Sequence, residues 1–125
     1  MTAAFVLAAT GTATAAPASS GGCSTTGATG TFTATPTGNS YAPFKVTLYV
    51  RDSLADGHHV RIRFRSSKVT GGSHTWQWRA HYDGAGTSST WNTTAHDAVN
   101  GIRAVGAEIA RFEGSTLLNS CVATG

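Results

Sequence analysis

The chain has 125 residues and carries nine Lys and Arg against six Asp and Glu, a formal net charge of +3 with histidine neutral. This length fits one domain. Gly and Thr are abundant, Leu is scarce, only 12% of residues are charged, and no apolar repeat of 3.6 residues persists for three turns. The composition therefore argues against a helical protein and favours an all-β one.

The first 18 residues are typical of a secretory signal peptide. An apolar stretch runs into small residues, and both 13–15 and 16–18 satisfy the A-x-A cleavage rule. No Lys or Arg precedes Lys45, so we expect the basic start of the signal to lie upstream of Met1. A structural Ala-rich helix is the alternative. The apolar run is too short for a membrane span, so we expect a secreted, extracellular protein with no span after cleavage.

Residues 19–40 are rich in Ser, Thr and Gly, which predicts a flexible segment with one candidate strand at 31–35. Cys23 and Cys121 lie near opposite ends of the mature chain. An extracellular compartment permits a disulfide between them. A disulfide that closes such a long loop would stabilise the fold by on the order of 4 kcal/mol, because it restricts the unfolded chain. A metal pair and a reactive thiol are the alternatives, but the sequence contains no CxxC partner set, so we predict the disulfide.

Strict alternation of apolar and basic or polar residues predicts two half-buried antiparallel strands, at 44–51 and 58–65. Further strands, separated by Gly-containing turns, are expected at 74–82, 101–112 and 117–122, and 87–95 is expected to be a polar strand or a loop. Short strands at this spacing predict a small antiparallel β-sandwich over residues 41–125, jelly-roll or immunoglobulin-like, closed by one disulfide. Its inner face is predicted to contain Val46, Leu48, Val60, Ile62, Phe64, Trp76 and Trp78.

Three segments carry a family resemblance: DSLADGHHVRIRF at 52–64, the Trp-rich stretch from Thr75 to Thr93, and ARFEGSTLLNSC at 110–121. They resemble small exported proteins of high-GC Gram-positive bacteria, a functionally uncharacterised group. The resemblance covers nearly the whole mature chain and implies a signal peptide, a β-sandwich and terminal cysteines. Its motifs are turn and strand signatures, so it implies no particular activity.

A basic sheet face is the first candidate site. If the strands at 44–51, 58–65 and 74–82 are neighbours, eight basic residues share one surface: Lys45, Arg51, His59, Arg61, Arg63, Arg65, Arg79 and His81. Rows of cations attract polymers that carry phosphate or carboxylate groups. The predicted function is therefore non-catalytic binding of an anionic polymer or cell-envelope glycan, with nucleic acid a weaker candidate. The alternative is a solvated exterior that keeps the protein soluble.

Two other function classes stay open. Trp76, Trp78 and Trp91 would suit a carbohydrate-binding module if they were exposed, with Trp91 the expected sugar contact, although the same rings also suit a core. A secreted effector, such as a small toxin or enzyme inhibitor, would present a protruding loop at 66–73 or 83–90.

The sequence gives little support for catalysis or for metal binding. The sequence contains no G-x-S-x-G, P-loop, Rossmann or HExxH motif. Most of the six acids lie at turns, which does not favour a glycosidase pair. Neighbouring His58 and His59 would point to opposite faces of a strand and cannot share one ion. We therefore predict no enzyme, no metal site and no cofactor.

Overall fold

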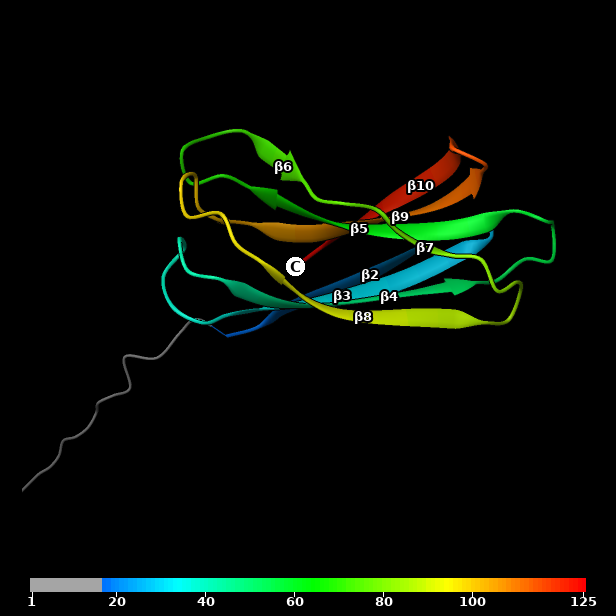
Figure 1. Cartoon of the computed structure of the whole chain (residues 1–125), viewed down its shortest axis with the longest axis horizontal. Helices are drawn as coiled ribbons and strands as arrows, with labels where there is room; N and C mark the ends of the chain where they lie inside the picture. Colours follow the sequence, from blue (N-terminus) through cyan, green and yellow to red (C-terminus); the bar gives the residue numbers. More distant parts are fainter. Residues whose placement is uncertain (1–16) are drawn as a thin grey trace, which may run out of the picture.

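The computed structural model describes residues 17–125, so the predicted signal peptide lies outside the described residues except for its last two positions. Two antiparallel sheets pack face to face (Figure 1). The β4 sheet has the order β2 (Ser19–Thr25), β3 (Ala28–Pro36), β4 (Phe44–Asp52) and β8 (Ser88–Ala95). The β5 sheet has the order β10 (Thr116–Thr124), β9 (Val105–Glu113), β5 (His59–Ser67) and β6 (Ser73–Thr75), and β7 (Arg79–His81) also pairs with β5. The predicted disulfide-closed β-sandwich is confirmed.

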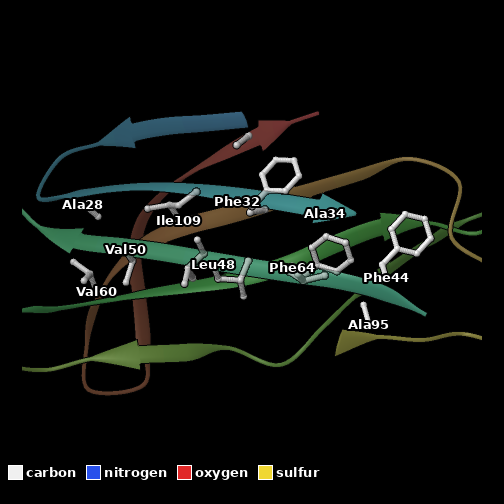
Figure 2. Close-up of a cluster of buried hydrophobic side chains, with 14 of the residues drawn as sticks. Ala28, Phe32, Ala34, Phe44, Leu48, Val50, Val60, Phe64, Ala95 and Ile109 are labelled. Atoms are coloured by element: carbon white, nitrogen blue, oxygen red, sulfur yellow. The ribbon is translucent and has the colours of Figure 1, made fainter. Parts of the chain in front are cut away.

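Alternation along the strands builds the core, because successive side chains of a strand point to opposite faces. In both β4 and β5 every second residue is buried. Figure 2 shows these apolar side chains filling the space between the sheets, joined by Phe32 of β3 and Ile109 of β9. The predicted core positions that are confirmed are Val46, Leu48, Val60, Ile62 and Phe64.

The two strands β4 and β5 lie in different sheets. β4 pairs with β3 and β8, whereas β5 pairs with β9, β6 and β7. The connection at 53–58 therefore carries the chain from one sheet to the other. As a consequence, the polar faces of β4 and β5 point to opposite sides of the molecule.

Segment 19–40 was expected to be flexible, and this expectation is wrong, because most of the segment forms the β2–β3 hairpin. The two strands pair from Ser19↔Ala34 to Thr25↔Ala28, around a turn in which Gly27 has φ of 80°. Ala28, Phe32 and Ala34 alternate with threonines and enter the core. Small polar residues here form a strand because every second position is apolar.

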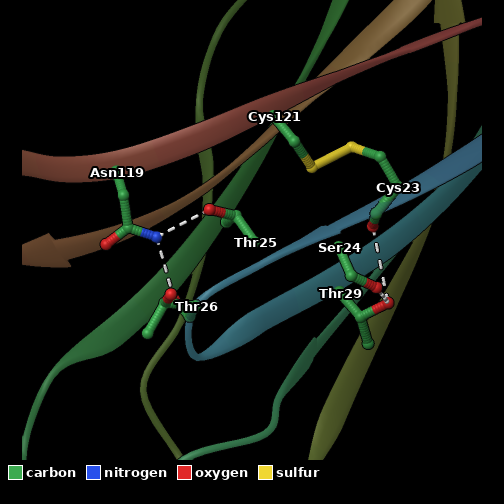
Figure 3. The surroundings of a disulfide bond; sticks show 7 residues. All are labelled: Cys23, Ser24, Thr25, Thr26, Thr29, Asn119 and Cys121. Atoms are coloured by element: carbon green, nitrogen blue, oxygen red, sulfur yellow. Dashed lines mark hydrogen bonds between the residues drawn. A yellow bond between two sulfur atoms is a disulfide. The ribbon is translucent and has the colours of Figure 1, made fainter.

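The disulfide joins the two sheets along one edge of the sandwich. Cys23 lies on β2 and Cys121 on β10, with a Cα–Cα distance of 6.2 Å (Figure 3). The Asn119 side chain reinforces the same edge, since its Nδ2 donates to Thr25 Oγ1 and to the Thr26 carbonyl, both at 2.9 Å. The opposite edge has no covalent link and is formed by β8 of one sheet and β6 and β7 of the other.

The predicted strand at 74–82 is interrupted by a β-bulge. Trp76 N donates to the Phe64 carbonyl, and Arg79 pairs with Ile62. Between these two positions Arg63 of β5 thus faces two residues, Gln77 and Trp78. The extra residue reverses which face the following residues occupy. Trp76 packs against the core, but Trp78 lies on the outer face, so its predicted place in the core is wrong.

Candidate functional site

The eight basic residues of the predicted face do not share one surface. His59, Arg61, Arg63 and Arg65 form a row on the outer face of β5, as predicted. Lys45 and Arg51 lie on the outer face of the β4 sheet, on the other side of the molecule. Arg79 and His81 turn inward, because they follow the bulge. The structure therefore corrects the single eight-residue surface to a four-residue row.

The row of β5 belongs to a mixed cluster that we call the basic–aromatic face. It consists of His59, Arg61, Arg63, Arg65, Trp78, Tyr82 and Phe112. Small residues of β9 make room for the long arginine side chains, since Arg61 pairs with Ala110 and Arg65 with Gly106. The guanidinium of Arg61 lies over the Phe112 ring, and that of Arg63 lies over the Trp78 ring.

Arg63 is neutralised within this face. Its Nε and Nη2 donate to Glu108 Oε1 at 2.9 and 2.7 Å, and its guanidinium carbon lies 4.3 Å from the centre of the Trp78 ring. Glu108 is only 9% exposed. A buried carboxylate needs such a partner, so Arg63 serves the fold and adds no net charge to the surface.

Arg61 and Arg65 retain their charge. Arg61 Nε donates to His59 Nε2 and its Nη2 donates to the Gly114 carbonyl, both at 2.9 Å, while its guanidinium carbon lies 4.1 Å from the Phe112 ring centre. None of these partners is an acid. Among residues 17–125, neither Arg61 nor Arg65 has a carboxylate within 4.0 Å.

The aromatic rings make a stacked layer beside these arginines. His59 stacks on Tyr82 at 4.3 Å and on Phe112 at 5.8 Å between ring centres, and Trp78 meets Phe112 edge-on at 5.2 Å. Phe112 is only 4% exposed and Tyr82 is 66% exposed. Tyr82 is therefore the most exposed ring of this face.

His59 contributes no charge near neutral pH. Burial lowers its pKa below the usual 6.5, and the nearby Arg61 charge lowers the pKa further. The hydrogen bond from Arg61 Nε requires a lone pair on His59 Nε2, which places the proton of the neutral ring on Nδ1.

The three tryptophans do not form a row for a sugar. Trp76 and Trp91 both pack against the core, and Trp76 Nε1 donates to Ser66 Oγ at 3.1 Å. Trp91 pairs with the inward-facing Leu48 and is half-buried. Trp78 alone lies on the outer face, covered by Arg63.

His81 forms a buried hydrogen-bond network that joins β7 to the strand β8. The side chain is 2% exposed, with Nε2 2.6 Å from Thr87 Oγ1 and Nδ1 2.6 Å from Ser89 Oγ. Thr87 donates its hydroxyl proton to the Gly84 carbonyl, so His81 Nε2–H donates to Thr87, and Nδ1 accepts from Ser89. Because His81 is covered, we interpret the network as a structural bridge between the sheets.

Phe112 and Tyr82 of the basic–aromatic face were not predicted as site residues, and neither was Glu108, the nearly buried partner of Arg63. The pairing of β5 with β9 places Glu108 opposite Arg63 and Phe112 opposite His59, which are 45 and 53 positions away in the sequence. The sequence feature that could have indicated Glu108 is its position, because it is the one acid in the middle of a predicted strand.

Within the part of the chain that the structure describes, no three His, Cys, Asp or Glu side chains are placed to hold a metal ion. Over the same residues, no helix is long and apolar enough to cross a membrane. Comparison with known proteins found no matching family model, curated protein or solved structure.

Proposed function

We propose that this chain is a secreted, non-catalytic binding protein that contacts an anionic polymer or cell-envelope glycan through its basic–aromatic face. The observation that carries the proposal is the pair Arg61 and Arg65, which project from one outer face without an acidic partner among residues 17–125. The neighbouring Tyr82 ring offers an exposed stacking surface.

The spacing of the two arginines suits an extended ligand. They lie four residues apart on one strand, which is about 13 Å at the usual rise per residue. Arg65 borders a shallow cavity of about 230 Å³ that also involves Gly106 and Val122. A guanidinium binds phosphate or carboxylate through two parallel hydrogen bonds, so successive anionic groups of a polymer would engage successive arginines.

Secretion is supported by the disulfide, because such bonds persist mainly in oxidising compartments outside the cytosol. The neutral-carbohydrate alternative has less support, because Trp76 and Trp91 pack against the core instead of facing a ligand. Salt distinguishes the two: binding by charge weakens steeply as ionic strength rises, and stacking on a neutral sugar does not.

The test is a double Arg61→Gln/Arg65→Gln variant that leaves Arg63 in place. It should elute from heparin, teichoic acid or DNA columns at much lower salt than the unchanged chain. The matched control is Lys45→Gln/Arg51→Gln, which removes the same charge from the opposite sheet and should elute close to the unchanged chain. Equal shifts for both variants would mean that retention follows net charge alone, and unchanged elution of the first would refute the proposed face.

A further inference from the structure

The strand β8 has one unpaired edge. It pairs with β4 over its whole length, from Phe44↔Ala95 to Arg51↔Ser88, and no backbone group of Ser88–Ala95 has another backbone partner within residues 17–125. Edge strands of monomeric proteins are usually protected by charged residues, proline or a bulge. The sequence of β8, SSTWNTTA, has neither a charge nor a proline, and its pairing is regular.

A mainly apolar cavity opens beside this edge, on the side of the sandwich away from the disulfide. Its volume is about 210 Å³, and its lining combines apolar side chains, among them Leu48, Phe64 and Trp76, with the polar Gln77, Thr93 and Thr94. A cavity of about 150 Å³ in another protein accepts benzene. This one therefore has room for a single aliphatic or aromatic side chain.

Arg79 places a positive charge at the same cavity. The bulge turns this residue inward, where Nη2 donates to Thr93 Oγ1 at 3.2 Å. Within the described part of the chain it has no carboxylate within 4.0 Å. A half-buried guanidinium beside an apolar cavity is suited to an anion that arrives together with an apolar group.

We propose that β8 and this cavity bind the C-terminal end of an extended peptide by strand addition. The peptide backbone would pair with the free edge of β8, its last side chain would fill the cavity, and its terminal carboxylate would pair with Arg79. Main-chain pairing supplies affinity in this mode and side-chain pockets supply specificity. A C-terminal apolar residue fits because it carries the side chain and the carboxylate on one Cα.

Charge favours a peptide over a second copy of the chain. A second copy of β8, with the sequence SSTWNTTA, would bring no carboxylate of its own to the Arg79 guanidinium. A peptide with a free carboxylate is instead complementary to Arg79.

The first experiment screens octapeptides that end in each apolar residue, as free acids and as C-terminal amides, against the full chain. Selected free acids should bind at least tenfold more tightly than their amides. Arg79→Gln should abolish this difference, Arg79→Lys should retain much of it, and Arg51→Gln should leave it unchanged. Equal binding of acids and amides by the unchanged chain would overturn the proposal, as would a difference that survives Arg79→Gln.

The second experiment locates the peptide by amide hydrogen exchange. Saturation with a selected free acid should slow exchange within Ser88–Ala95, while Arg61→Gln/Arg65→Gln should leave peptide affinity unchanged because that face is separate. Protection confined to another strand would overturn the proposal. The proposal would also be overturned if the chain sedimented as a dimer and its β8 amides were protected without peptide, because a second copy would then occupy the β8 edge.

Discussion

At the scale of single residues, Arg63 and Glu108 show why a row of identical side chains need not act alike. Arg61, Arg63 and Arg65 recur every second residue, yet only Arg63 faces a carboxylate across the sheet. Since Glu108 is nearly buried, removing its partner Arg63 lowers the free energy of unfolding. A variant that replaces all three arginines would therefore confuse loss of binding with loss of stability.

The pair can be tested by stability measurements. We expect Arg63→Gln to lower the free energy of unfolding by about 2–3 kcal/mol, because a charged acceptor loses its donors in a nearly buried site. Adding Glu108→Gln should restore much of the loss, since two amides can hydrogen-bond without an unpaired charge. Urea denaturation of the single and double variants measures both effects. Arg51→Gln, exposed on the other sheet, is the control, and an equal loss there would contradict the assignment.

At the scale of the elements, the period-two alternation predicted the inward and outward faces of β4 and β5 correctly, because facing depends on local sequence. Pairing depends on distant segments, so the alternation did not indicate that 53–58 crosses between sheets. The alternation also did not predict the bulge near Trp76, because no Gly or Pro lies at that point of the sequence. The extra residue of the bulge turns Arg79 and His81 inward, away from the predicted site. All four residues of the observed row lie on one strand, β5, which is why that part could be predicted.

Gly30 of β3 gives a test of close packing between elements. A Cβ at this position would lie 2.6 Å from Ile109 Cγ1 and 2.7 Å from the Tyr49 carbonyl. We expect Gly30→Ala to destabilise the fold by about 1–3 kcal/mol, because neither neighbour can move without disturbing the core. Chemical denaturation measures the change. Thr31→Ala, on the exposed face of the same strand, should stay within about 0.5 kcal/mol. Similar effects of the two substitutions would show that the core adapts around Gly30.

At the scale of the whole molecule, the disulfide spans 98 positions and encloses almost all of the sandwich. Replacing both cysteines by serine should lower the free energy of unfolding by about 4 kcal/mol, because the unfolded chain regains its freedom. Denaturation midpoints of the variant and of the reduced unchanged protein should agree. A loss below about 1 kcal/mol would mean that the β2 and β10 edges hold together without the bond.

The position of this bond also determines how the protein would respond to mechanical force. A load applied at Ser19 and Gly125 reaches the sulfur–sulfur bond after four residues at each end, since Cys23 lies four positions after Ser19 and Cys121 four positions before Gly125. The covalent bond then carries the tension, and the strands between the two cysteines are shielded from it. Stretching can peel only the ends of β2 and β10, so under load the sandwich behaves as a short inextensible link.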